Sequence, residues 1–130
     1  MQNLSGWERH FSIGNWMLDN QHRNILILCR HMVDRIADGR SFETVGEELL
    51  AVSAEHFAAE EKLLEITGYA DLAGHCAEHR RMLASLEQQF DAVSSGRIDP
   101  EALSDYLSGW CLEHILGSDR QFSRFIQVRH

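Results

Sequence analysis

Three histidines and a glutamate recur at intervals of four in the segment HFAAEEKLLEITGYADLAGHCAEH, residues 56–79. They form two pairs, His56 with Glu60 and His75 with His79. Residues four apart on a helix differ by about 40° around its axis, so each pair can aim at one point. Imidazole nitrogens and carboxylate oxygens are ligands for first-row transition metals. The spacing therefore predicts that both pairs serve one metal cluster.

A histidine lies on the apolar stripe of each of four predicted helices, which adds His22 and His114 to the set. Taken singly, each is explained as a core histidine bonded to a carbonyl or carboxylate, because an unpartnered buried imidazole costs a few kcal/mol. Five in one narrow core are satisfied together by one metal cluster. Asp119 follows His114 by five positions, about 140° around an ideal helix. It joins the cluster if the helix ends or distorts at Gly117, and otherwise only caps the tail.

Other polar residues are predicted to lie off this face. His31 is nine positions from His22, about 180° around the same helix, and should face solvent. Glu61 is about 100° from Glu60 and should point away from the ligands. Two further histidines are expected at the surface: His10 and His130. The Glu-x-x-His pairs of carboxylate-rich di-iron bundles and the His-Glu-x-x-His motif of zinc proteases are both absent from the sequence.

The elements that must position these residues are helices. Apolar residues recur three and four apart and strand-like alternation is absent, which predicts an all-α fold. Cap and stop signals mark the helix ends: Asp19, Ser41 and Asp99 as N-caps, Gly39 and Gly68 as stops. Helices of ~20 residues with short joints run antiparallel, giving an up-down-up-down four-helix bundle. The predicted helices span 19–38, 41–67, 70–94 and 99–117, after an irregular arm over 1–18 and before a short helical tail.

Length, composition and charge limit the classes of protein to which this sequence can belong. The 130 residues, 44% of them hydrophobic, suit one domain over 1–130. A formal charge of −8 disfavours nucleic acid and anionic membranes as partners. No cationic, apolar leader or stretch of ~20 apolar residues is present, so a cytoplasmic location is expected. Cys29, Cys76 and Cys111 form no C-x-x-C pair, which predicts reduced thiols.

The sequence resembles the hemerythrin family, in particular its bacterial members. Four motifs carry the resemblance, in the family's order and over almost the whole chain: LDNQH ending at His22, HFAAEE from His56, GYADLAGHCAEH ending at His79, and WCLEHILGSD ending at Asp119. The resemblance implies a non-haem centre of two iron ions, with an oxo or hydroxo bridge, that binds O2 reversibly. Carried over by position, the ligands of one iron would be His75, His79 and His114, those of the other His22 and His56, and the bridging carboxylates Glu60 and Asp119.

The same resemblance implies an open position on the iron with two histidines, where O2 would bind. Side chains next to the ligands are expected to line an apolar O2 pocket: Ile25, Phe57, Met82, Trp110, Cys111 and Ile115. Met82 stands where the family leads us to expect an aromatic residue, and Cys111 where it leads us to expect leucine. Both are explained as core filling; the alternative is that their sulfur is oxidised beside bound oxygen.

The leading functional prediction is an O2-binding protein for storage, delivery or sensing, not an enzyme. One alternative is a di-iron oxidase, peroxidase or NO-handling enzyme that uses the same open site. Another is an interaction domain with a structural metal such as zinc. The sequence carries no output domain, which favours storage or delivery, or a sensor that acts through a separate protein partner. Its exposed faces look solvated, which favours a monomer.

Overall fold

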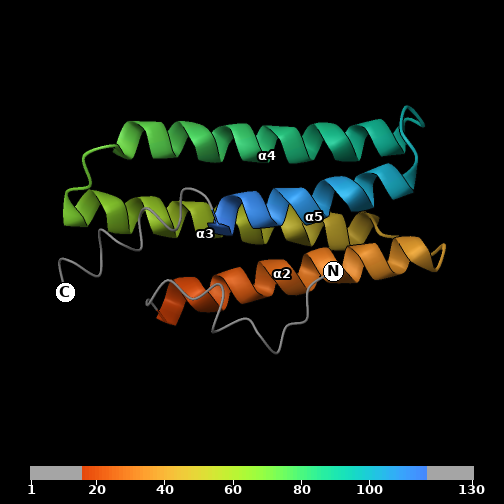
Figure 1. Ribbon diagram of the computed structural model, residues 1–130, viewed down its shortest axis with the longest axis horizontal. Coiled ribbons are helices and arrows are strands. Elements are labelled where there is room, and N and C mark those ends of the chain that lie inside the picture. Colours follow the sequence, from red (N-terminus) through yellow and green to blue (C-terminus); the bar gives the residue numbers. More distant parts are fainter. Residues whose placement is uncertain (1–15, 117–130) are drawn as a thin grey trace.

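The structure, a computed structural model, describes the backbone of residues 16–116 and the side chains of residues 17–110. Within those bounds the chain forms four helices and no strand. The helices are α2 (Trp16–Ala37), α3 (Glu43–Thr67), α4 (Leu72–Ser94) and α5 (Pro100–Leu116). They lie side by side along one long axis, and short connections reverse the chain between consecutive helices (Figure 1).

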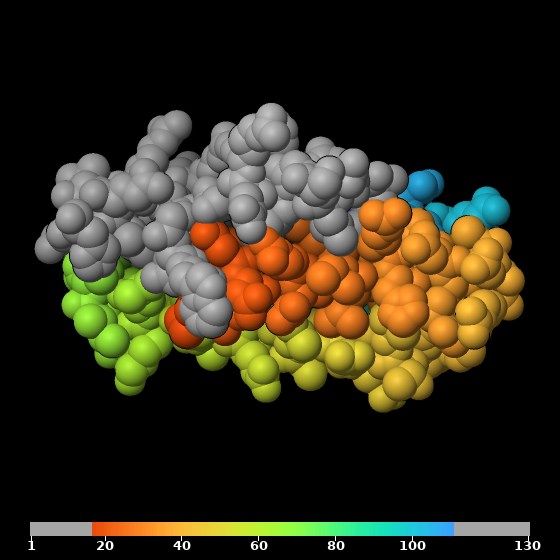
Figure 2. Space-filling model, turned by 90° about the horizontal axis from the view of Figure 1, so that it is seen from below, coloured from red at the N-terminus to blue at the C-terminus, as the bar shows by residue number. Residues whose placement is uncertain are grey.

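Each helix packs against two neighbours, so the four helices close a ring around a common core. α2 contacts α3 and α5, and α4 contacts the same two helices from the other side. Figure 2 shows one of these contacts from below, where the red to orange side chains of α2 lie alongside the yellow ones of α3. The all-α, up-down-up-down antiparallel bundle predicted from the sequence is therefore confirmed. The predicted C-terminal tail and residues 1–15 of the arm lie outside the described residues, whereas residues 16–18 belong to α2.

The helix starts differ in part from the predicted caps. α2 begins at Trp16, which places Asp19 in its first turn. α3 begins at Glu43, with Phe42 and not Ser41 at the N-cap position. The Ser41 hydroxyl, which was expected to accept from a backbone N–H of the helix, donates to the Glu43 carboxylate (2.6 Å). Asp99 behaves as predicted, since its Oδ1 accepts the Ala102 N–H (2.9 Å) at the start of α5.

The joint between α3 and α4 is short because Gly68 reverses the chain. Gly68 has a φ of 75°, a left-handed conformation that a side chain disfavours. Its N–H donates to the carbonyl of Glu65, and the N–H of Tyr69 donates to that of Leu64. These bonds satisfy carbonyls at the end of α3 and let α4 fold back along it.

The apolar core is divided into two parts by a polar layer. The larger cluster contains buried residues of all four helices: Ile25, Leu26, Cys29, Met32, Val45, Leu49, Phe57, Met82, Leu86, Leu103, Leu107 and Trp110. The smaller cluster centres on Leu18 and Leu64. His22 and Glu60 fall between the two clusters along their helices. None of the described helices is long and apolar enough to cross a membrane.

Candidate metal centre

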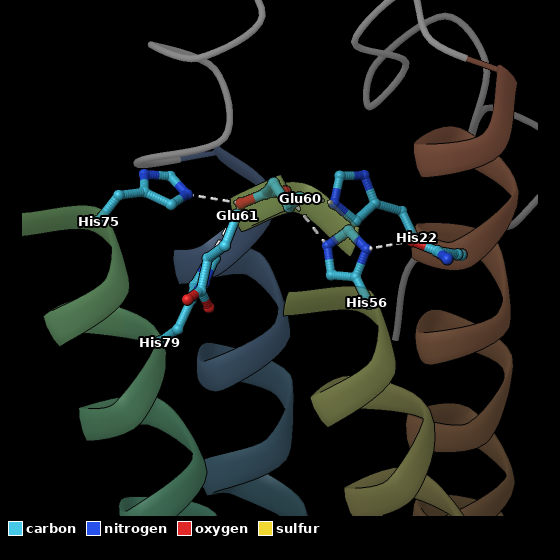
Figure 3. Close-up of polar contacts among 7 residues, drawn as sticks. His22, His56, Glu60, Glu61, His75 and His79 are labelled. Atoms are coloured by element: carbon cyan, nitrogen blue, oxygen red, sulfur yellow. Dashed lines mark hydrogen bonds and ion pairs between the residues drawn. The ribbon is translucent and has the colours of Figure 1, made fainter. Parts of the chain in front are cut away.

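Five polar side chains form the layer that divides the core. His22 comes from α2, His56 and Glu60 from α3, and His75 and His79 from α4. None of the five is more than 4% exposed. Figure 3 shows the imidazoles pointing at Glu60 from two sides, His75 and His79 from α4 and the other two from α3 and α2. The spacing of four thus brings both pairs to one point, as expected.

The carboxylate of Glu60 is shared between the two sides. Its Oε1 lies 2.5 Å from Nε2 of His75 and 3.0 Å from Nε2 of His79. Its Oε2 lies 3.3 Å from Nε2 of His56 and 4.0 Å from Nε2 of His22. Each oxygen therefore belongs to its own pair of imidazoles, and one carboxylate joins the two pairs.

Two of these rings are also hydrogen-bonded through Nδ1, the ring nitrogen that faces away from Glu60. Nδ1 of His56 donates to the amide oxygen of Gln21 (2.8 Å), and Nδ1 of His79 donates to the carboxylate of Glu61 (2.9 Å). A proton on Nδ1 leaves the Nε2 lone pair available for a metal ion. Both contacts therefore favour the tautomer in which Nε2, the nitrogen that faces Glu60, can bind a metal ion.

The expectation that Glu61 points away from the ligands is wrong. The rotation of about 100° from Glu60 directs the Glu61 side chain toward α4, where His79 lies. Gln21 was not singled out from the sequence, and Glu61 was considered only as a residue that faces away from the ligands. Their position in the sequence could have indicated them, because each directly adjoins a predicted ligand. On a bundle helix, a residue next to an inward-facing one points toward a neighbouring helix.

Glu61 also accepts a hydrogen bond from the Cys76 thiol. Burial alone would raise the pKa of Glu61, but the hydrogen bonds from Cys76 and His79 hold it below its ordinary value. Burial and the bond to Glu61 raise the pKa of Cys76 to about 11, so the thiol is protonated at neutral pH. Cys76 is therefore a hydrogen-bond donor in this arrangement.

Apolar side chains cover the layer on the side of the larger cluster. Ile25, Phe57, Met82 and Trp110, which were expected to line a pocket, are all at most 4% exposed. The Phe57 ring stacks on His79, with ring centroids 4.1 Å apart. Trp110 donates its indole N–H to the carbonyl of Met82 (3.1 Å), which ties α5 to α4. Their role as a pocket lining stays a prediction.

Four of the predicted site residues cannot be placed with these. The backbone of Cys111, His114 and Ile115 lies in α5, but their side chains lie outside the described residues, as does all of Asp119. His31 is exposed, as expected, and His10 and His130 lie outside the described residues.

The donor set fits a cluster of metal ions. Two groups of three buried side chains, His22–His56–Glu60 and Glu60–His75–His79, each offer ligand atoms within 4.8 Å of one another. Imidazole and carboxylate ligands suit iron and its neighbours in the transition series. Because Glu60 belongs to both groups, the arrangement suits two ions that share one carboxylate.

Comparisons with known proteins agree with this geometry. The family model described as "Hemerythrin HHE cation binding domain" matches residues 14–126. A "Bacteriohemerythrin" of Stenotrophomonas maltophilia is 28% identical over 123 residues, covering 90% of this chain and 78% of the relative. A protein of the same name from Methylococcus capsulatus is 29% identical, covering 80% and 82% of the two chains. A "Myohemerythrin" of Riftia pachyptila is 25% identical, covering 89% and 88%.

Proposed function

The chain belongs to the hemerythrin family, and on that premise we propose that it binds O2 reversibly at a non-haem di-iron centre, for storage, delivery or sensing. The observation that carries the proposal is the shared carboxylate. Glu60 presents one oxygen to His75 and His79 and the other to His56 and His22. Two ions joined by a carboxylate require this division, whereas a single structural zinc would need only one of the two groups.

The ligands of the centre divide between its two halves. In our proposal His22 and His56 hold one iron, His75 and His79 hold the other, and Glu60 bridges them. His114 and Asp119 complete the set, His114 on the half of His75 and Asp119 as a second bridge. A di-iron centre, when bound, supplies two electrons and an open coordination position for O2.

The surrounding residues keep this chemistry reversible. The buried side chains of Ile25, Phe57, Met82 and Trp110 exclude water from the side of the larger apolar cluster. Exclusion of water limits the proton delivery that would release reduced oxygen and leave the iron oxidised. Gln21 and Glu61 fix the two imidazoles from behind. These features support reversible binding of O2 and argue against catalytic turnover.

The alternative is a di-iron oxidase, peroxidase or NO-handling enzyme. Such an enzyme needs a proton donor on the side where substrate is bound. The four expected lining residues that the structure describes carry no titratable group, and the carboxylate of Glu61 is bonded to His79 and Cys76 on the outer side. The monomeric state, a separate protein partner and a cytoplasmic location stay predictions from the sequence.

One experiment separates these functions. The protein is loaded with iron, reduced without air, exposed to O2, and returned to argon while its visible spectrum is recorded. We expect two irons per chain and a spectral change that reverses under argon. Irreversible bleaching accompanied by consumption of an added reductant would indicate an enzyme. Zinc in place of iron, with no response to O2, would contradict the proposal.

A further inference from the structure

The two halves of the centre differ in the group that accepts a hydrogen bond from Nδ1 of one histidine in each half. His56 is backed by the neutral amide of Gln21 at 2.8 Å, and His79 by the carboxylate of Glu61 at 2.9 Å. Both supporting atoms are oxygens on the Nδ1 side, so the geometry of the two contacts is nearly the same. The difference between them is one negative charge.

The Glu61 carboxylate is itself held in place. It lies on α3 and reaches across to His79 on α4, and its side chain is 31% exposed. The Cys76 thiol, also on α4, donates to it. Two donors from the neighbouring helix thus fix one carboxylate against the outer nitrogen of His79. A solvated surface glutamate has no such arrangement.

We propose that Glu61 is a positioning residue that orients His79 for the metal and makes the two halves of the centre electronically unequal. The inference rests on the proposed function, since it concerns a ligand of the proposed iron. A carboxylate that accepts from Nδ1–H fixes the ring and increases the basicity of the coordinating nitrogen. The coordinating nitrogen of His79 is therefore more electron-rich than that of His56, which is backed by a neutral amide.

Orientation and charge can be tested separately. Glu61→Gln keeps an oxygen that accepts from Nδ1 but removes the charge, whereas Glu61→Ala removes both. Glu65 supplies a matched control, because it is an exposed carboxylate one helical turn further along α3, and Glu65→Gln removes the same charge. Gln21→Glu is the reciprocal change, since it adds a charge behind His56.

The readouts are zinc affinity by competition with a chelator, iron per chain, and the midpoint reduction potential of the iron-loaded protein. We expect Glu61→Ala to weaken zinc binding about 10- to 100-fold. Glu61→Gln should recover most of that affinity yet raise the reduction potential, and Gln21→Glu should lower the potential. Glu65→Gln should change neither quantity. The unfolding transition of each variant identifies any that fails to fold.

The outcomes distinguish this inference from the function on which it rests. A wild-type protein that takes up no metal contradicts the proposed function and the role of Glu61 together. If the wild type takes up two irons, equal potentials for Glu61→Gln and Glu65→Gln would mean that only net charge matters. Unchanged affinity in Glu61→Ala would mean that His79 needs no support. Either result would overturn the role of Glu61 and leave the proposed function intact.

Discussion

Nε2 of His75 lies 2.5 Å from Oε1 of Glu60, a contact that joins α4 to α3 inside the core. Both side chains are buried, so neither meets bulk water. A buried carboxylate is stable only where charge or hydrogen-bond donors surround it. Metal ions held between Glu60 and the four imidazoles would supply that charge, and the first prediction concerns the loss of this carboxylate.

Glu60→Ala should abolish assembly of the centre. The change removes the one group that both pairs of histidines share, so we expect metal affinity to fall by more than about 100-fold, beyond the roughly 10- to 100-fold loss for a supporting residue. Iron per chain after anaerobic reconstitution and desalting measures this. Glu55→Ala, an exposed glutamate beside His56 on the same helix, is the control and should retain its iron. Equal iron in the two variants would mean that Glu60 is not a ligand.

Gly68→Ala should destabilise the protein. The left-handed φ of 75° at this residue costs about 1–2 kcal/mol once a Cβ is present. Gly109→Ala is the matched change, because an added Cβ there meets no atom of the other described parts of the chain within 4 Å. Alanine also favours a helix over glycine by up to about 1 kcal/mol. Urea unfolding at one fixed metal concentration compares the two. Shifts of the midpoint in the same direction would contradict this account of the joint.

Ser53→Ala should leave stability unchanged or increase it. Ser53 is fully buried in α3, and among the described residues its hydroxyl has no hydrogen-bond partner. Leaving a polar group unpaired in the core costs about 1–3 kcal/mol. Ser85→Ala should instead lower the free energy of unfolding by about 1 kcal/mol, because the Ser85 hydroxyl bonds to the hydroxyl of Tyr106. A larger loss for Ser53→Ala than for Ser85→Ala would show that the Ser53 hydroxyl has a partner.

The stability of the start of α3 should depend slightly on pH. The Ser41 hydroxyl, helped by backbone N–H groups, lowers the pKa of Glu43. A lowered folded-state pKa adds stability that is complete above the unfolded pKa and is lost as the pH falls through the folded value. Ser41→Ala should therefore raise the pKa of Glu43, measured by NMR titration of its carboxyl carbon. Ser95→Ala should leave it unchanged, since the Ser95 hydroxyl bonds to Ala92 and Arg97.

Periodicity predicted the fold and the inward-facing histidines because both depend on angles around a single helix axis. His22, His56, His75 and His79 are each on the buried side of their helix, and His31 is on the exposed side, as the angles required. The antiparallel order followed from helix length and short joints. These properties are local or nearly local in sequence.

The contacts behind the ligands could not be predicted in this way. The angle of Glu61 correctly separates it from Glu60, but it does not say that α4 stands in the direction in which Glu61 points. Ser41 was predicted to accept from a backbone N–H as an N-cap, but its hydroxyl donates to the Glu43 carboxylate. In both cases the outcome depends on which partner is nearest in three dimensions, and a rotation angle carries no such information.

The joint at Gly68 has a consequence for the order of folding. Glu60 and its α4 partners are 15 and 19 residues apart, whereas His56 and Gln21 are 35 residues apart. Loop-closure entropy makes the longer connection less favourable by roughly 0.7 kcal/mol, so the α3–α4 hairpin should form before α2 docks. Substitutions such as Leu64→Ala in the hairpin should then slow refolding, and Met32→Ala in α2 should mainly speed unfolding. A refolding chain would thus present half of its binding site while the other half is still unfolded.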